Sequence, residues 1–278
     1  VVISHKETVP AELVERADRL RLIQHLGKDA RGLPLDVIQA RNLLATATPL
    51  VNYTTVAEQA WATILSLQKR LSEQRAVMEQ TEPPIQWGPN FPRIRPLSDL
   101  TIGFVGFGEI ARPMARVAAA FNMRIQYWDV QPFPDLEAEY GVQWADWDDL
   151  WVTSDIVSLQ LALNEKTQGL VGEWEFEHMK PDAIFQNSAR GKLVNEGELI
   201  AILQAGLIGG AALDVYYDEP LSLDSPLREL QRTHPERVML TPHSGSAGPW
   251  TWVRDSQELW FNVRRLLNGE PVHHVIGA

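Results

Sequence analysis

The stretch TIGFVGFGEIARPMARVAAAF, residues 101–121, joins an apolar run to a glycine-rich turn and then to a helical pattern. The turn has the form G-x-G-x-x-A, with Gly106, Gly108 and Ala111 at its three small positions. Glycine at the first position permits a tight turn, glycine at the second lets the backbone approach a pyrophosphate, and a small third residue lets the helix pack closely on the strand. Phosphates would then lie at the helix N-terminus, where free N–H groups and the helix dipole favour anions.

An acidic residue at the end of the next apolar run strengthens this interpretation. Asp129 follows Gly108 by 21 residues, at the end of the run RIQYWDV. A carboxylate at this place accepts hydrogen bonds from the hydroxyls of an adenosine ribose and repels a 2′-phosphate. The nearby segment VQPFP contains no Arg that could receive such a phosphate. The pattern therefore predicts a dinucleotide site with a preference for NAD over NADP.

Helices and strands alternate along most of the chain. From Thr101 onward, short apolar runs are separated by helical patterns, which is typical of a parallel sheet covered on both faces. The first part of the chain repeats this rhythm on a smaller scale, and the Pro-rich segment 81–99 between the two parts indicates a surface linker. We expect an α/β protein with a Rossmann-type doubly wound domain at residues 74–249. A smaller α/β domain is expected at residues 1–73, completed by the C-terminal helical pattern at residues 250–278.

Composition excludes several classes of function. The chain has 278 residues, no Cys and a formal net charge of −11, which disfavours binding to nucleic acids or anionic membranes. The opening residues VVISHKETVP do not resemble a signal peptide and no apolar run is long enough to span a membrane, so we expect a cytoplasmic protein without a membrane partner. The absence of Cys rules out thiolate metal sites, and we predict no metal site.

Polar residues follow several of the later apolar runs. Arg190 follows AIFQNS, Asp214 ends GGAALDV, and His243 follows RVMLTP. Because ligands of open parallel sheets bind beyond the carboxyl ends of the strands, these side chains should meet at the edge that also holds the nucleotide. Glu219 lies on the loop after Asp214 and should belong to the same group.

The residues around these positions resemble a known family. The stretch NSARGKLVNEGELIAILQAGLIGGAALDVYYDEP, residues 187–220, followed by LTPHSG, is similar to the signature region of the NAD-dependent D-isomer-specific 2-hydroxyacid dehydrogenases. The family's catalytic Arg, Glu and His fall on Arg190, Glu219 and His243. The residue that usually holds the nicotinamide carboxamide falls on Asp214.

The resemblance also implies further features. Glu109, Ile110 and Ala189 are expected to join the glycines in binding NAD, and the smaller domain is expected to be a flavodoxin-like substrate domain. Relatives commonly form homodimers through the nucleotide domain. We expect the same here, with the Trp-rich segment from Trp144 to Trp151 supplying apolar surface.

The chemistry of the three catalytic residues suits oxidoreduction of a small molecule. Arg190 offers a rigid fork of donors for the carboxylate of a 2-oxo acid. A hydride from the nicotinamide reaches the carbonyl carbon while protonated His243 gives its proton to the developing alkoxide, and Glu219 orients the imidazole and favours its charged form. Oxidation of the D-2-hydroxy acid is the reverse reaction.

Two departures from the family keep alternatives open. Relatives usually have at least one more strand and helix before the position of Val1, so we expect an incomplete first domain. The substrate-binding loop is expected at Leu26, Gly27 and Lys28, but Asp29 stands where relatives have a second glycine. Lys28 admits a phosphite-dehydrogenase-like reaction, and the shortened domain admits a non-catalytic NAD-sensing corepressor. Formate dehydrogenases are disfavoured, because they typically have Gln at the position of Glu219.

Overall fold

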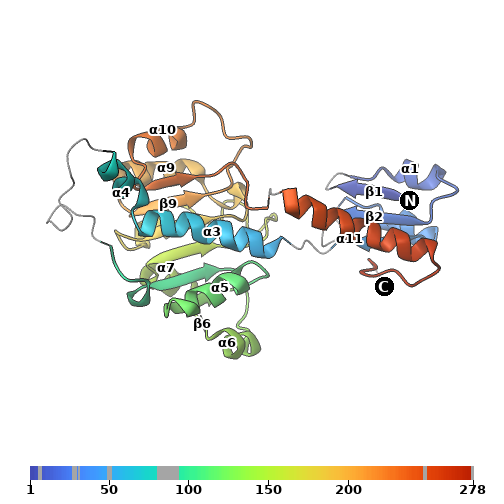
Figure 1. Ribbon diagram of the computed structural model, residues 1–278, viewed down its shortest axis with the longest axis horizontal. Coiled ribbons are helices and arrows are strands. Elements are labelled where there is room, and N and C mark those ends of the chain that lie inside the picture. The colour runs from blue at the N-terminus through green and yellow to red at the C-terminus, as the bar shows by residue number, and fades with distance from the viewer. Residues whose placement is uncertain are drawn as a thin grey trace. The chain divides into compact units, whose positions relative to one another are not determined.

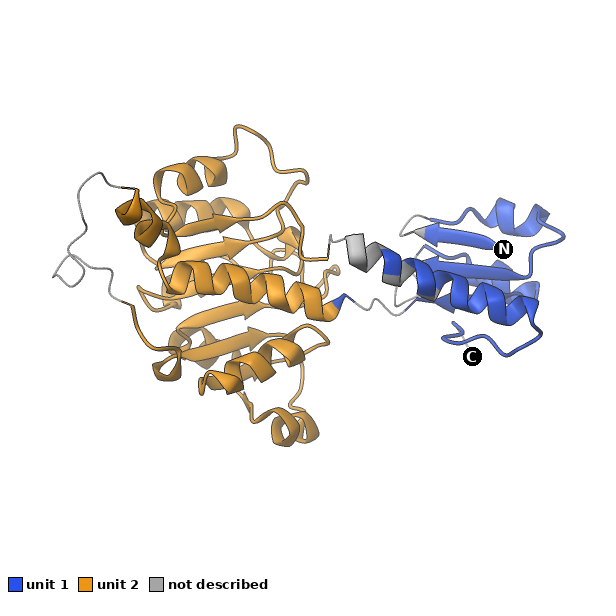
Figure 2. Ribbon diagram, in the orientation of Figure 1, with its two compact units in different colours: residues 1–52, 247–278 blue, residues 53–246 orange. Residues whose placement is uncertain are grey.

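The computed structural model describes residues 1–5, 8–26, 30, 32–48, 52–79, 94–246 and 249–276. The chain forms two compact units, which are coloured separately in Figure 2. Unit 1 combines residues 1–52 with residues 247–278, and unit 2 comprises residues 53–246.

Unit 1 is a small α/β unit built on a three-stranded parallel sheet. Its elements are β1 (Val2–His5), α1 (Ala11–Arg16), β2 (Leu22–Leu26), α2 (Leu35–Ala40), β3 (Leu44–Ala47) and α11 (Pro249–Leu267). The three strands pair in parallel in the order β1-β2-β3. Neighbouring residues of β2 face opposite sides of this sheet. Ile23 packs in the apolar core with Val14 of α1 and Ile38 of α2, whereas the Gln24 side chain accepts a hydrogen bond from Asn262 of α11.

Helix α11 therefore belongs to the same unit as the first part of the chain. Beyond α11, the backbone continues along β3, where the Ala47 N–H donates to the His274 carbonyl and the Ile276 N–H donates to the Ala45 carbonyl. The two ends of the sequence therefore build one unit.

Unit 2 is the larger unit. Its elements in chain order are α3 (Tyr53–Gln68), α4 (Leu71–Met78), η1 (Leu97–Asp99), β4 (Thr101–Val105), α5 (Ala111–Ala120), β5 (Arg124–Trp128), α6 (Pro134–Tyr140), β6 (Gln143–Trp144), α7 (Trp147–Thr153), β7 (Ile156–Leu159), α8 (Glu173–His178), β8 (Ile184–Asn187), η2 (Gly191–Leu193), α9 (Glu196–Ala205), β9 (Gly210–Leu213), α10 (Pro226–Thr233) and β10 (Val238–Leu240).

The strands of unit 2 form one parallel sheet with helices on both faces. Its order is β10-β9-β8-β7-β4-β5-β6, so the chain winds in one direction from β4 to β6 and in the other from β7 to β10. One apolar cluster packs α3, α5 and α6 on one face, and a second packs α7, α8, α9 and α10 on the other. Helices α3 and α5 lie across the near face in Figure 1. The predicted doubly wound Rossmann-type sheet is confirmed.

The long helix α3 belongs to unit 2, although the sequence suggested a first domain that runs to residue 73. Ala57, Trp61 and Ile64 are buried in the same apolar cluster as α5. The Trp61 indole N–H also donates to the Met114 carbonyl at 3.1 Å. The helical pattern alone could not indicate which sheet this apolar face would cover, and the boundary between the units therefore falls before Tyr53.

The Trp-rich segment is an internal feature of unit 2. Trp151 is fully buried, and Trp147 packs between Trp128 and Trp151 with ring centroids 4.7 and 5.6 Å away. Trp144 is partly buried against the other apolar cluster. The segment therefore offers less exposed apolar surface than the sequence suggested, because Trp151 is fully buried and Trp144 and Trp147 are partly buried.

Candidate functional site

The predicted site residues follow strands whose last residues pair with one another across the sheet. The last residues of six strands lie in register across the sheet: Trp128, Val105, Leu159, Asn187, Leu213 and Leu240. Asp129, Gly106, Arg190, Asp214 and His243 each come within three residues of such a strand end. They therefore share the carboxyl edge of the sheet, where open α/β sheets bind their ligands, as the sequence predicts.

The glycine turn has the backbone that its sequence requires. Gly106 has a φ of +94°, and a Cβ there would lie 2.9 Å from the Gln160 carbonyl oxygen. A Cβ at Gly108 would meet no atom within 4 Å, so the backbone at this position faces open space. Ala111 is fully buried in the first turn of α5. The geometry fits a turn that admits a pyrophosphate at the start of a helix.

Asp129 is tied to this turn by hydrogen bonds. Its Oδ2 accepts from the Phe107 N–H at 2.9 Å, and its Oδ1 accepts from the Val130 N–H at 2.8 Å. Among the ion pairs of the described residues, none involves Asp129. The arrangement brings a carboxylate to the glycine turn, where it suits the ribose of NAD and disfavours the phosphate of NADP.

Three further residues predicted to bind the cofactor lie near the glycine turn or next to Arg190. Glu109 points its carboxylate at Arg112, with 3.1 Å between Oε1 and Nη1, and this cation reduces the repulsion that Glu109 would exert on a phosphate. Ile110 directly precedes α5, and Ala189 is buried next to Arg190. Contacts of Glu109, Ile110 and Ala189 with NAD remain predictions.

The turn that carries Arg190 is braced by Asn187. The buried Asn187 amide donates to the Arg190 carbonyl at 3.1 Å and accepts from the Ala189 N–H at 2.9 Å. Gly191 follows with its backbone pressed against Tyr216, since a Cβ on Gly191 would lie 1.9 Å from the Tyr216 carbonyl carbon. The Arg190 side chain itself is exposed at the edge of the sheet.

His243 and Glu219 form a direct pair. His243 Nδ1 lies 2.7 Å from Glu219 Oε2, and the two side chains are 42% and 35% exposed. Because a carboxylate only accepts hydrogen bonds, Nδ1 is the donor in this contact and Nε2 is left for another partner. The other Glu219 oxygen accepts from the Tyr216 N–H at 3.1 Å. The sequence prediction that these two residues meet is borne out by this distance, while their catalytic roles remain predictions.

Asp214 holds the loop on which His243 lies. This carboxylate is 5% exposed and accepts from the Thr241 hydroxyl, from the Ser244 N–H at 2.9 Å and from the Gly245 N–H at 2.9 Å. Both of its oxygens therefore serve the loop of residues 241–245. The sequence assigns Asp214 to the nicotinamide carboxamide, and that role remains a prediction beside this observed contact.

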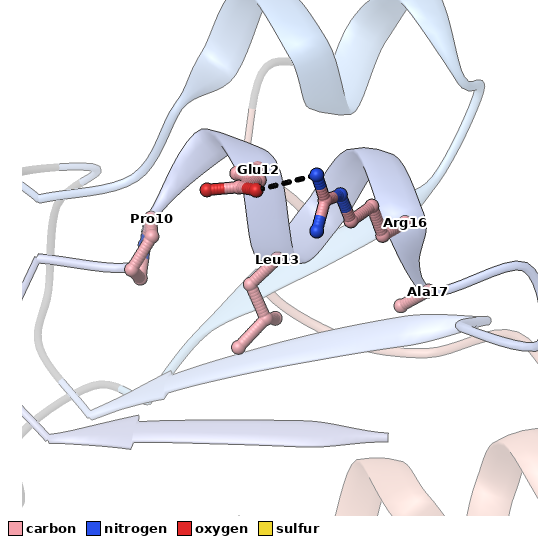
Figure 3. A pocket seen from close by; sticks show the side chains of 5 residues that line it. All are labelled: Pro10, Glu12, Leu13, Arg16 and Ala17. Atoms are coloured by element: carbon pink, nitrogen blue, oxygen red, sulfur yellow. Dashed lines mark ion pairs between the residues drawn. The ribbon is translucent and has the colours of Figure 1, made fainter.

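The His243 and Glu219 pair opens onto a cavity of about 570 Å³. Its wall also includes Tyr216, Pro220 and Leu240, so an acid–base pair is combined with apolar surface, as is common in small-molecule sites. A hollow beside α1 in unit 1 offers no such chemistry (Figure 3). There, Glu12 and Arg16 pair with each other at 2.8 Å and their charges cancel.

Most of the predicted substrate loop lies outside the described residues. Leu26 is the last residue of β2, whereas Gly27 and Lys28 lie outside the described residues. Within the part of the chain that the structure covers, no cluster of three or more His, Cys, Asp or Glu could hold a metal ion. Within the same part, no helix has the length and apolar character needed to cross a bilayer.

Sequence reasoning missed two residues that build the site, Asn187 and Tyr216. Both precede predicted site residues by three positions, since Asn187 comes before Arg190 and Tyr216 before Glu219. A polar residue at the buried end of an apolar strand, as in AIFQNS, is a signal for Asn187, because a buried amide needs partners in the following turn. No comparable signal marks Tyr216, because its contacts with Thr241 and Gly191 join segments that are distant in sequence.

Comparisons with known proteins agree with this geometry. Residues 61–245 match the family model for the NAD-binding domain of D-isomer specific 2-hydroxyacid dehydrogenases. A glyoxylate reductase of Korarchaeum cryptofilum is 33% identical over 264 residues, which cover 95% of this chain and 78% of the relative. A glyoxylate/hydroxypyruvate reductase B of Shigella boydii is 36% identical over 247 residues, which cover 88% of this chain and 74% of the relative.

A solved structure supports the same assignment. The D-lactate dehydrogenase of Lactobacillus jensenii, crystallised with NAD+, superposes with a TM-score of 0.84 at 25% identity. The match covers 100% of this chain and 86% of that protein. The sequence match, the shared fold and the edge that gathers Gly106, Asp129 and His243 lead to one conclusion: the chain belongs to the D-isomer-specific 2-hydroxyacid dehydrogenase family.

Proposed function

We propose that the protein reduces a small 2-oxo acid to the D-2-hydroxy acid with NADH, and catalyses the reverse oxidation with NAD+. The observation that carries this proposal is the 2.7 Å contact between His243 and Glu219 at the same sheet edge as the glycine turn. An imidazole that is held by a carboxylate through Nδ1 has its Nε2 available for proton transfer.

The cofactor would be held by unit 2. The turn at Gly106 and Gly108 would receive the pyrophosphate, and Asp129 would accept hydrogen bonds from the adenosine ribose. NADH, when bound, supplies the hydride. The fit is supported by the open space above Gly108 and by the Asp129 carboxylate at the same turn.

Arg190 would recognise the acid group of the substrate. Its guanidinium is exposed beyond the end of β8, and Asn187 braces the turn beneath it. A planar fork of donors pairs with a carboxylate through two parallel hydrogen bonds, which also fixes the orientation of the adjacent carbonyl. Arg190 therefore orients and polarises the substrate.

His243 would provide the proton. Its Nε2–H donates to the carbonyl oxygen as the alkoxide develops, and Glu219 keeps the imidazole oriented through Nδ1. Reduction needs the protonated imidazole, whereas oxidation needs the neutral one. The rate of reduction should therefore fall toward alkaline pH, and the rate of oxidation should rise.

We propose glyoxylate, hydroxypyruvate and similar small 2-oxo acids as the substrate class. The proposal rests on two relatives named for these acids, one of them 36% identical. The substrate-binding loop is proposed from the sequence at Leu26, Gly27 and Lys28. The proposed partner is a second copy of the chain, and cytoplasmic location remains a prediction from the sequence.

One assay tests this function and separates it from the alternatives. The purified protein is mixed with NADH and a panel of glyoxylate, hydroxypyruvate and pyruvate, and the loss of NADH absorbance is followed. We expect turnover with at least one of these acids. A second series offers NAD+ with phosphite. Reduction of NAD+ by phosphite without any turnover of 2-oxo acids would favour a Lys28 mechanism, and NADH binding without turnover in either series would favour a corepressor.

A further inference from the structure

Tyr216 contacts all three segments that carry the proposed catalytic residues. It lies three residues after the last residue of β9 and is 5% exposed. Its neighbours are the turn at Gly191, the Glu219 carboxylate and the loop that begins at Thr241.

The Tyr216 hydroxyl supports the turn at His243. It lies 2.8 Å from the Thr241 carbonyl oxygen and 3.2 Å from that of Leu213, and its single proton can serve only one of them at a time. The shorter distance favours Thr241. The same Thr241 oxygen also accepts from the His243 N–H at 3.0 Å. One carbonyl thus joins the buried phenol to the residue that bears the imidazole.

The His243 backbone needs such support. Its φ is +54°, in the left-handed region that residues with a Cβ adopt only at a cost. A strained turn persists when surrounding contacts fix it. Tyr216 fixes it from one side through Thr241, and Asp214 fixes it from the other through the Ser244 and Gly245 N–H groups.

The Tyr216 backbone supports the other two residues. Its N–H donates to Glu219 Oε1, which leaves Oε2 directed at His243. Its carbonyl is in contact with Gly191, directly after Arg190. Burial raises the pKa of the Tyr216 phenol, and the nearby Asp214 adds to the rise. The hydroxyl therefore keeps its proton and remains a donor at neutral pH.

We propose that Tyr216 is a positioning residue, whose hydroxyl fixes the His243 turn so that the imidazole meets both Glu219 and the substrate carbonyl. This inference rests on the proposed function for the role of His243. Proton transfer depends steeply on the distance between donor and acceptor, so a small displacement of the turn lowers the rate of the chemical step. Binding of the cofactor depends on other residues and is left intact.

The test is the variant Tyr216→Phe, which keeps the ring and the backbone N–H but removes the hydroxyl. Tyr217→Phe is the matched control. Tyr217 is 44% exposed, and its ring and N–H contact Lys192 and Glu196, while its hydroxyl makes no hydrogen bond among the described residues. We expect Tyr216→Phe to lower kcat for 2-oxo acid reduction about tenfold, the equivalent of one lost hydrogen bond. The KM for NADH should stay unchanged, and Tyr217→Phe should behave like the wild type.

A second measurement does not depend on activity. Hydrogen–deuterium exchange, followed by mass spectrometry of peptides that span residues 241–246, should be faster in Tyr216→Phe and unchanged in Tyr217→Phe. An unchanged kcat, an unchanged exchange rate, or a KM for NADH that rises in parallel with the fall in kcat would each overturn the inference. If the wild type binds NADH but reduces no 2-oxo acid, the proposed function fails. The exchange data still decide whether the hydroxyl fixes the turn.

Discussion

We propose that a few side chains at the ends of strands determine what unit 2 can bind. The carboxylate of Asp129 is the clearest case, because it accepts from the Phe107 N–H inside the glycine turn and still faces the ligand edge of the sheet. The same carboxylate therefore shapes the turn and would select the cofactor.

Replacing Asp129 by Ala should weaken NADH binding and reduce the preference for NADH over NADPH. A carboxylate that accepts from a ribose hydroxyl contributes about 1.5–3 kcal/mol, so the KM for NADH should rise about tenfold or more. Steady-state kinetics with both cofactors measure this, and Asp135→Ala, an exposed acidic residue of α6, is the control. A wild type that prefers NADPH would show that Asp129 does not select the cofactor.

Much of the site could be predicted at the level of single residues. Gly106, Asp129 and His243 occupy positions that motif spacing assigns to one sheet edge, and the structure brings them to that edge. Tyr216 and Asn187 could not be predicted in the same way. Tyr216 depends on backbone groups of Thr241 and Gly191, whose positions only the fold determines. Asn187 braces the adjacent Arg190 turn, and its signal in the sequence is a polar residue at the end of an apolar strand rather than motif spacing.

Elements pack closely where the Arg190 turn meets the segment after β9. Gly191 starts η2, and its Cα lies against the Tyr216 backbone. Gly197, in the first turn of α9, has room, because a Cβ there would lie 3.6 Å from the nearest atom, Asn195 Oδ1. These two glycines therefore respond differently to the same substitution.

Gly191→Ala should destabilise the protein by about 2 kcal/mol or more and lower turnover, because the added methyl overlaps the Tyr216 carbonyl. Gly197→Ala, the matched control in a helix, should stabilise it by about 0.5–1 kcal/mol. Chemical denaturation of both variants gives these values. Equal stability of the two variants would contradict the packing described here.

The sequence predicted most elements well and their packing less well. Helix α9 begins after Asn195, a residue type that often caps helices, and ends before Gly206, which has the left-handed conformation of a helix stop. The Asn195 side chain, however, makes no capping hydrogen bond. The assignment of α3 to the first domain was wrong. An amphipathic pattern indicates that a helix has a buried face but does not indicate which sheet covers it.

At the scale of the whole molecule, charges at the opposite edge of the large sheet contribute to stability. Asp155 is 4% exposed and accepts from the Thr101 N–H at 2.8 Å. Lys180 and Arg95 lie 3.1 and 3.0 Å from its other oxygen. Although burial alone would raise the pKa of Asp155, the Thr101 N–H and the two cations hold it below its ordinary value.

Asp155→Asn should therefore destabilise the protein at pH 7 by about 1–3 kcal/mol. Because the pKa of the folded state is lowered, this contribution is complete above the unfolded value of about 3.9 and is lost as the pH falls through the folded value. The difference in the free energy of unfolding between wild type and variant, measured by denaturation from pH 7 to pH 3, should become smaller as the pH falls. Asp182→Asn, whose exposed carboxylate also reaches Arg95, should have little effect. A difference in the free energy of unfolding that does not change with pH would contradict the assignment of this stabilisation to the ionised Asp155 carboxylate.

The proposed dimer needs an apolar surface other than the Trp-rich segment. Helix α4 buries none of its residues, and Leu71 and Met78 are 50% and 74% exposed. We expect light scattering at micromolar concentration to give about twice the 31.3 kDa of one chain. Met78→Glu should shift the mass toward the monomer, whereas Leu223→Glu, at a site elsewhere that is 88% exposed, should not. A single species of one chain's mass in the wild type would exclude the dimer.

The central claim is that His243, held by Glu219, donates the proton in the reduction of a 2-oxo acid. The most direct test compares NADH-dependent turnover of the best accepted acid by the wild type and by His243→Ala, with NADH affinity measured in parallel. General acid catalysis contributes about 10²- to 10⁴-fold, so turnover should fall by that factor. NADH affinity should remain near the wild-type value, because we expect it to depend on Gly108 and Asp129. Near-normal turnover of His243→Ala would contradict the mechanism.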